Sequence, residues 1–292
     1  ELVLYPQKDL SGYEAFAGPS LNRQLMLQFL YSYTLEPPVW IRDGFQAWAE
    51  RLVWNRDTGK VSESDYSPWI ESARVLRSDP SRKLSIGNIL SAVTGSYDTT
   101  QLYPQAWAFV SFILSDNRNE VRRFLHESFY ILQGDGHYNS AAQSELTRRI
   151  QERWGRVQPD DNLESAFDQW LSTRMTFSEM VQSGVSEYNA GRNAQALQLL
   201  LQARAIRPED PLLTYYLGLV EYAEGNYAEA ENWYIQSLSF GAEASTVNWA
   251  LGLNYLSLGR EKEAIACLEA ASQNNPDRYA LRVEQLLKSL RK

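Results

Sequence analysis

The chain of 292 residues is long enough to form two domains with hydrophobic cores. Its hydrophobic content of 44% and charged content of 22% are typical of a soluble globular protein. A net charge of −8 argues against nucleic acid as the main partner. No apolar run is long enough to span a membrane, and the single cysteine, Cys267, excludes an internal disulfide framework. The chain begins with Glu1 rather than Met, so we expect a processed or excised piece of a longer protein.

The front half is predicted to be helical after one short strand at Leu2 to Tyr5. Ser20 is a plausible N-cap for a helix through about Tyr31. Pro37 and Pro38 then break the chain. Further helices are expected at about residues 39–54, 68–77, 85–94, 102–115, 118–133, 139–155 and 160–173. No glycine-rich phosphate-binding loop is present in the sequence.

The stretch "NRQLMLQFLYSYTLEPPVWIRDGFQAWAE" resembles the gluzincin metallopeptidases, in particular the peptidase-MA-like families that are often fused to tetratricopeptide repeats. Those families carry H-E-x-x-H on one helix, and a W-x-x-E-G-x-A helix then brings the third zinc ligand. The stretches "YPQAWAFVSFIL" and "DNLESAFDQWLS" resemble later helices of the same families. The resemblance covers about residues 1–175 and implies a helical, zincin-like domain. A sheet beside the helix that contains Leu21 would favour this ancestry.

The residues at the family's catalytic columns differ from the motif. In place of H-E-x-x-H the chain reads Arg23-Gln24-Leu25-Met26-Leu27. Asp43 stands at the column of the third ligand. Zinc needs three or four lone-pair donors, and a glutamine cannot accept a proton from a metal-bound water. We therefore expect no metal, no cofactor and no catalytic residue, and a pseudoenzyme rather than an enzyme.

In the family, the positions that correspond to Arg23 and Asp43 face each other through the metal ion, so here a cation and an anion are expected to face each other without it. We expect Arg23 and Asp43 to form a salt bridge, or to share a polar network with Gln24. The two histidines, His126 and His137, are expected to have structural or surface roles.

The second half contains an internal repeat with a period of 34 residues. Gly184, Gly218 and Gly252 follow this period. So do further columns of Gly191/Gly225/Gly259, Ala196/Ala230/Ala264, Leu200/Tyr234/Leu268 and Ala203/Ser237/Ala271. The stretches resemble tetratricopeptide repeats, which are pairs of antiparallel helices. We place three repeats at 177–210, 211–244 and 245–278, followed by an amphipathic helix that caps the last repeat.

The resemblance implies a concave groove lined by the first helix of each repeat. Its expected lining residues are Val181, Val185, Tyr188, Asn189, Leu212, Tyr215, Leu219, Tyr222, Thr246, Trp249, Leu253 and Leu256. These columns hold no Lys or Arg, so capture of a peptide's C-terminal carboxylate is not expected. The groove suits an apolar peptide or helix. The sequence favours equally the alternative that a helix of the same chain fills the groove.

Together these features predict a mainly α chain, with a degenerate peptidase-MA-like domain over residues 1–175 and a tetratricopeptide solenoid over 176–292. We expect a non-catalytic scaffold that binds a protein partner. Two alternatives remain open: the C-terminal part of a metallopeptidase-like enzyme whose catalytic residues lie elsewhere, and a purely structural helical assembly protein. Analogy with the family favours an exported bacterial protein.

Overall fold

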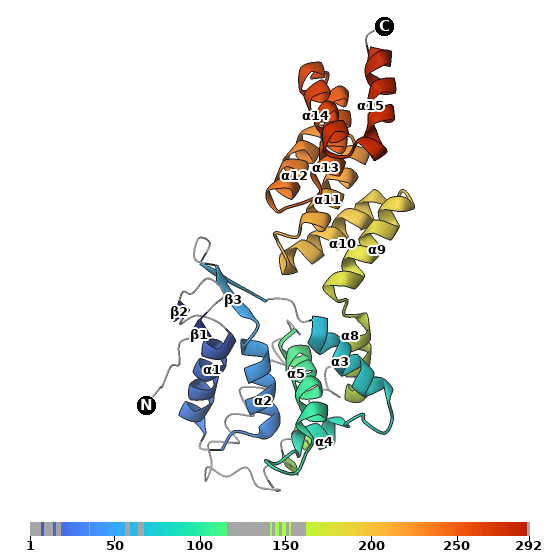
Figure 1. The fold of residues 1–292 in the computed structure, drawn as a ribbon. Helices are drawn as coiled ribbons and strands as arrows, with labels where there is room; N and C mark the ends of the chain where they lie inside the picture. The colour runs from blue at the N-terminus through green and yellow to red at the C-terminus, as the bar shows by residue number, and fades with distance from the viewer. Residues whose placement is uncertain are drawn as a thin grey trace. The chain divides into compact units, whose positions relative to one another are not determined.

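The computed structural model describes residues 7–8, 14–15, 19–34, 36–55, 59–63, 67–115, six positions between 141 and 152, and 162–290. The chain divides into two compact units, Glu1–Thr176 and Phe177–Lys292. Figure 1 shows the described helices and strands of both units. The described residues are mainly α-helical.

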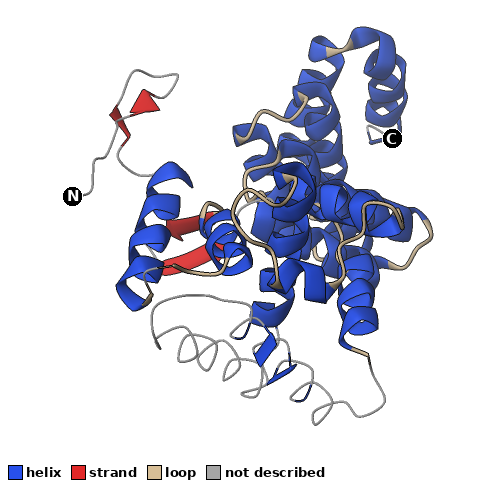
Figure 2. Ribbon diagram, turned by 90° about the horizontal axis from the view of Figure 1, so that it is seen from below, coloured by secondary structure: helices blue, strands red, loops and turns tan. Residues whose placement is uncertain are grey.

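The front unit combines helices with two short antiparallel strand pairs (Figure 2). Its elements are β1 (Gln7–Lys8), β2 (Glu14–Ala15), α1 (Pro19–Tyr33), α2 (Val39–Ala49), β3 (Leu52–Asn55), β4 (Lys60–Glu63), α3 (Ser67–Ser78), α4 (Ile86–Leu90), α5 (Thr99–Ser115) and α8 (Leu163–Thr173). In the β3–β4 hairpin, Leu52 pairs with Glu63 and Asn55 pairs with Lys60. The side chain of Asn22 on α1 donates to the Leu52 carbonyl at 2.7 Å, so this small sheet lies beside α1.

Helix α5 forms the centre of the front unit and contacts α2, α3, α4 and α8. Its Phe109 is fully buried and meets Trp40 of α2 and Phe167 of α8 in edge-on contacts at 5.7 and 5.5 Å. Gly44 allows α2 to approach α5 closely, because a Cβ there would lie 2.8 Å from the Ala106 carbonyl oxygen. Burial of these large aromatic side chains is the main stabilisation of this core.

Several expectations for the front unit need correction. The helix expected over 39–54 ends at Ala49, because Leu52–Asn55 pairs with β4 as a strand. Ser20 is not an N-cap, since α1 already begins at Pro19. The helix expected at 85–94 is only Ile86–Leu90, and Ser85 caps it by accepting from the Asn88 amide. The predicted strand at 2–5, the helix at 118–133, most of the helix at 139–155, His126 and His137 lie outside the described residues.

The second unit is built from paired helices that follow the 34-residue period. The helices are α9 (Phe177–Asn189), α10 (Asn193–Ile206), α11 (Pro211–Ala223), α12 (Tyr227–Ser239), α13 (Ala244–Ser257), α14 (Glu261–Asn274) and α15 (Pro276–Leu290). The members of each pair, α9 with α10, α11 with α12 and α13 with α14, pack together. The turn glycine of each pair has a positive φ, for example +80° at Gly225, a conformation that glycine adopts without strain.

The crossing glycines lie where the two helices of a pair meet, as predicted. At Gly218 an added Cβ would lie 2.5 Å from the ring of Tyr234, and Gly184 and Gly252 face Leu200 and Leu268 in the same way. The small residue on one helix therefore accommodates a large residue on the other, and this relationship recurs in each repeat.

Helix α15 covers the end of the last repeat. Tyr279 and Val283 are buried against Leu268 and Ala271 of α14. Pro276 is the first residue of α15, a position that tolerates the missing N–H.

Candidate interaction groove

The expected partner-binding residues lie on α9, α11 and α13, the first helices of the three pairs. We call the following seven side chains the groove face: Val185, Tyr188, Tyr215, Leu219, Tyr222, Trp249 and Leu253. All seven are half-buried. Helix α11 contacts both α9 and α13, so side chains in equivalent columns of successive repeats are neighbours. Among the other expected lining residues, Asn189 and Leu212 are exposed, and Val181, Thr246 and Leu256 are half-buried.

Tyrosine side chains dominate the middle of this surface. The ring of Tyr215 lies 5.8 Å from that of Tyr216 and 5.9 Å from that of the buried Tyr234. The ring of Tyr222 lies 5.5 Å from that of Tyr227. Burial raises the pKa of Tyr215 to about 12, with smaller contributions from neighbouring tyrosines, and burial also raises the pKa of Tyr188. These phenols therefore stay neutral at physiological pH and present apolar rings with polar tips.

The third repeat contributes Trp249, one face of which is taken by the same chain. Its ring stacks on Tyr279 of α15 with centroids 5.5 Å apart and planes inclined by 28°. Arg278 lies over the ring of Tyr279 and donates to the Thr246 hydroxyl at 3.3 Å. At Trp249, the groove face is therefore partly covered by a helix of the same chain, α15.

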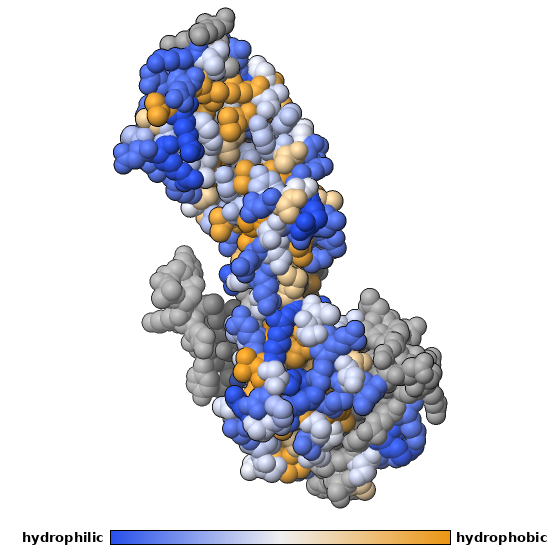
Figure 3. Space-filling view, turned by 90° about the vertical axis from the view of Figure 1, so that its right-hand side faces the viewer, coloured by the Kyte–Doolittle hydropathy of each residue, from blue (hydrophilic) through white to orange (hydrophobic). Residues whose placement is uncertain are grey.

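The first helices provide no basic side chain to this surface. Helices α9, α11 and α13 contain no Lys or Arg and three acidic residues, Glu179, Glu187 and Glu221. On the side of the repeats seen in Figure 3, hydrophobic residues gather between hydrophilic margins. Apart from Arg278 of α15, which reaches Thr246, the side chains on this surface come from helices without a cation, and they suit an apolar segment better than a carboxylate terminus.

Arg23 and Asp43 of the front unit do not form the expected ion pair. Arg23 donates from Nε to Gln46 Oε1 at 3.0 Å and from Nη1 to Glu50 Oε1 at 3.3 Å. The buried carboxylate of Asp43 instead accepts from Arg42, with Nε 2.7 Å from Oδ1. The predicted Arg23–Asp43 bridge is wrong because Arg23 meets α2 about one and two turns beyond Asp43, at Gln46 and Glu50.

The other residues of the substituted motif are scattered around α1. Gln24 and Leu25 are exposed, Leu27 is half-buried, and Met26 packs against the front-unit core. Within the described part of the chain, no group of three or more His, Cys, Asp or Glu side chains is placed to hold a metal ion. None of the described helices is long and apolar enough to cross a membrane.

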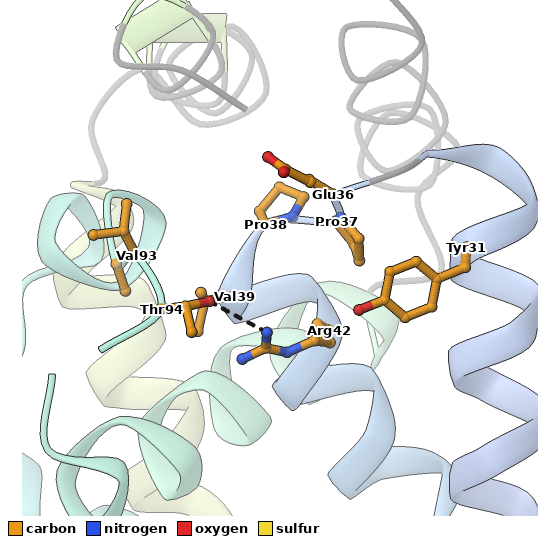
Figure 4. Close-up of a pocket in the computed structure, with 9 residues that line it drawn as sticks. Tyr31, Glu36, Pro37, Pro38, Val39, Arg42, Val93 and Thr94 are labelled. Atoms are coloured by element: carbon orange, nitrogen blue, oxygen red, sulfur yellow. Dashed lines mark hydrogen bonds between the residues drawn. The ribbon is translucent and has the colours of Figure 1, made fainter. Parts of the chain in front are cut away.

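A polar pocket beside Asp43 was not expected from the sequence. It has a volume of about 400 Å³ and is lined by Tyr31, Glu36, Pro37, Pro38, Val39, Arg42, Ala92, Val93 and Thr94. Figure 4 shows Arg42 on its floor, bonded to Thr94, with the hydroxyl of Tyr31 directed towards the guanidinium. The Tyr97 hydroxyl also donates to Asp43 at 3.1 Å, and burial together with the Asp43 charge raises the Tyr97 pKa to about 12.

This pocket could not be found from the sequence, because its parts come from separate segments of the chain. Tyr31 lies on α1, Arg42 lies on α2, and Thr94 lies in the segment between α4 and α5, which also carries Tyr97. The side chains of Arg42, Asp43 and Tyr97 satisfy one another, with Arg42 Nη2 also 3.1 Å from Tyr97 Oη. The cluster therefore ties α2 to that segment.

Comparison with known proteins identifies the repeats. Residues 182–244 match one family model described as a tetratricopeptide repeat, and residues 245–278 match another with the same description. The predicted tetratricopeptide repeats are thereby confirmed. Anaphase-promoting complex subunit 6 of Arabidopsis thaliana is 35% identical over 79 residues, which are 25% of this chain and 14% of that protein. The chain thus matches only a small part of this curated relative's length.

Two solved structures are also similar. A chain of the CopN-Scc3 complex has 15% sequence identity and a TM-score of 0.36, covering 60% of this chain and 100% of that one. A structure of MamA AMB-1 has 15% identity and a TM-score of 0.34, covering 59% of this chain and 92% of that one. Likenesses this weak add nothing on function.

Proposed function

We propose that this chain is a non-catalytic scaffold that binds an apolar or helical segment of a protein partner on the groove face of its tetratricopeptide repeats. The repeats imply protein partners. The observation that carries the proposal is the set of seven half-buried aromatic and aliphatic side chains on the first helices. Rigid aromatic side chains contribute large contact area at a low entropic cost, and they are enriched among residues that dominate binding. The name of the curated relative places that protein in a multisubunit complex, which also supports this role.

Affinity purification with matched surface variants tests the groove. Leu253 on α13 is replaced by arginine, and the control is Ile235→Arg on α12, a side chain that is 49% exposed on a second helix of a pair. Both changes place the same charge at a partly or largely exposed aliphatic position. We expect partners recovered with the wild-type chain to persist with Ile235→Arg and to be lost with Leu253→Arg. Equal recovery by both variants would overturn the groove as the binding surface.

We further propose that the front domain, residues 1–175, is a degenerate peptidase-MA-like domain. The α1–loop–α2 arrangement, joined by the Arg23–Gln46 hydrogen bond, supports this descent. The β3–β4 hairpin beside α1 is a second supporting feature. Arg23 and Leu27 provide no zinc ligand at the columns of the two histidines, and Gln24 is no general base.

Restoring the motif tests this descent. A variant with Arg23→His, Gln24→Glu, Leu27→His and Asp43→Glu should gain zinc if α1 and α2 descend from such a site. The matched control keeps the first three changes and carries Asp43→Asn. We expect the first variant to bind zinc more tightly than the control. If neither variant retains zinc, the purely structural alternative is favoured, and peptidase activity in the wild-type chain would support the enzyme alternative.

A further inference from the structure

We infer that the segment received by the groove face is a cationic amphipathic helix, with apolar residues against the tyrosines and Lys or Arg at the acidic end of α11. This inference rests on the proposed function and specifies the chemistry of the partner. Three independent observations carry it: the charge of the repeats, the environment of two carboxylates beside Tyr222, and the helix that the repeats already hold.

The repeats are acidic, and their four arginines are engaged within the unit. Residues 177–275 contain 12 acidic and five basic residues, a net charge of −7. The four arginines among the five lie against acidic or aromatic side chains: Arg192 on Glu187, Arg204 over Trp233, Arg207 over Phe177, and Arg260 on Glu231, Glu263 and Tyr255. An approaching cationic segment therefore meets a surface of opposite net charge, which favours its association.

Two carboxylates, Glu221 and Glu224, lie at the C-terminal end of α11, the helix that carries Tyr222 of the groove face. Glu221 accepts from the Asn226 amide group at 2.8 Å, and Glu224 accepts from the Asn193 amide group at 2.8 Å. These partners are neutral, so they satisfy hydrogen bonds without cancelling the carboxylate charges. The C-terminal end of the α11 dipole adds negative potential at the same place. Tyr222 lies between these two residues in sequence and belongs to the groove face.

The unit already holds one helix of the inferred kind. Residues 276–292 contain five basic and two acidic residues, a net charge of +3. The α15 part of this segment buries Tyr279 and Val283 against the last repeat and leaves Leu281 exposed. Its aromatic contact is the stack of Tyr279 on Trp249. The end of the solenoid thus accepts an amphipathic, basic helix through aromatic and aliphatic contacts, the same side-chain chemistry that the groove face offers along α9 and α11.

Fluorescence anisotropy with designed peptides tests the inference on the full chain. The probes are a labelled amphipathic Leu/Lys helix, its Leu/Glu counterpart with the same leucine positions, and a Leu/Lys peptide of scrambled order that forms no apolar face. We expect the amphipathic Leu/Lys peptide to bind at least about tenfold more tightly than either other peptide, a difference of about 1.4 kcal/mol. Its affinity should also fall as ionic strength rises, because the carboxylates lie at the surface.

Protein variants locate the binding. Leu253→Arg should weaken the amphipathic Leu/Lys peptide about tenfold, whereas Ile235→Arg, with the same change in charge, should leave its affinity within about threefold. The double change Glu221→Gln and Glu224→Gln should weaken it about threefold to tenfold, in keeping with surface ion pairs of up to about 1 kcal/mol each. Circular dichroism of each variant checks that the helices are retained.

The possible outcomes separate the two proposals. If the Leu/Glu peptide binds as tightly as the Leu/Lys peptide and Leu253→Arg weakens both, the groove binds helices but the inferred cationic character is wrong. If the scrambled peptide binds equally well, the interaction is non-specific charge attraction and the inference is overturned. If no peptide binds, or Leu253→Arg and Ile235→Arg behave alike, the groove itself is not the binding surface.

Discussion

Trp249 of α13 stacks on Tyr279 of α15, with ring centroids 5.5 Å apart and planes inclined by 28°. The hydroxyl of Tyr279 also lies 3.2 Å from that of Thr246 on the same helix as Trp249. Tyr279 is only 2% exposed, whereas Leu281, two residues later, is 67% exposed. Tyr279 thus anchors the first turn of the C-terminal helix, with Val283 buried one turn later, and the Tyr279 ring contacts Trp249 of the groove face.

Removing this anchor should release α15. We expect Tyr279→Ala to destabilise the docked helix by about 3–5 kcal/mol, the usual range when a large buried aromatic side chain is truncated. Hydrogen exchange measured by mass spectrometry should show faster exchange over α15. The control is Leu281→Ala on the same helix, which should change stability by less than about 0.5 kcal/mol. Unchanged exchange over α15 in Tyr279→Ala would show that the other apolar contacts of the helix hold it in place.

A methyl group at Gly218 should separate α11 from α12. The added Cβ would lie 2.5 Å from the Tyr234 ring, which is itself buried, so the ring has little freedom to move. We expect Gly218→Ala to destabilise the repeat by about 1–3 kcal/mol through overpacking. The rate of hydrogen exchange at the α11 and α12 amides, measured by mass spectrometry, should rise, and it should rise less in the neighbouring repeats.

Gly87 provides the control for this change. An added Cβ there meets only Ser85 Oγ, at 3.7 Å, so Gly87→Ala should fit. It should be neutral or stabilising by up to about 1 kcal/mol, because alanine is the better helix former. If Gly218→Ala also proves neutral, the close crossing of α11 and α12 is not a determinant of repeat stability.

Acid should weaken the contact between α3 and α8. The buried guanidinium of Arg77 binds the carboxylates of Glu164 and Asp168, and Lys83 binds Asp168 as well. Burial acts to raise the pKa of Asp168, but its bonds to Arg77 and Lys83 outweigh this, and its net pKa lies below the usual 3.8. A lowered folded-state pKa contributes stability that is present above pH 3.8 and is lost as pH falls through the folded-state value.

The Asp168→Asn variant tests this contribution. At pH 7 we expect it to lower the free energy of unfolding by about 1–3 kcal/mol, since Arg77 is left with one carboxylate fewer. The difference from the wild-type chain should shrink as pH falls below 3.8, because the wild-type carboxyl then becomes protonated, first in the unfolded chain and at lower pH in the folded chain. Urea unfolding at pH 7 and over a series of acidic pH values provides the measurement. A difference that does not change with pH would assign the effect to packing rather than to charge.

Zinc content tests the interpretation of the front unit directly. The guanidinium of Arg23 bonds to Gln46 and Glu50, and Asp43 bonds to Arg42 and Tyr97, so neither supplies a free ligand to a common point. We expect much less than one zinc ion per chain by elemental analysis after purification without chelators. Near-stoichiometric zinc, retained after dialysis, would contradict this expectation. Arg23→Ala should cost less than about 1 kcal/mol, because the Arg23 side chain is 46% exposed.

The helices of the repeat unit were largely predictable because equivalent residues recur every 34 positions in the sequence. Gly218 and Tyr234 occupy columns that recur every 34 residues, and a repeat contacts mainly its sequence neighbours. The crossing of α11 and α12 therefore followed from sequence alone. The helix boundaries in the front unit were less predictable, because the strand Leu52–Asn55 acquires its conformation by pairing with Lys60–Glu63. An isolated apolar run such as "LVW" fits a helix or a strand equally well until a partner strand is present.

The sequence by itself determined that Arg23, Gln24 and Leu27 stand where the resemblance would require metal ligands and a base. It also determined that the first helices of the repeats are rich in aromatic residues and contain no Lys or Arg. Only the tertiary structure decided which residues meet. Arg23 bonds to Gln46 and Glu50 rather than to Asp43, Asp43 bonds to Arg42 and Tyr97, and Tyr279 covers one face of Trp249. The physical reason is that a displacement of one helical turn between two packed helices, about 5.4 Å, exchanges every long-range side-chain partner while leaving each helix and its sequence pattern unchanged.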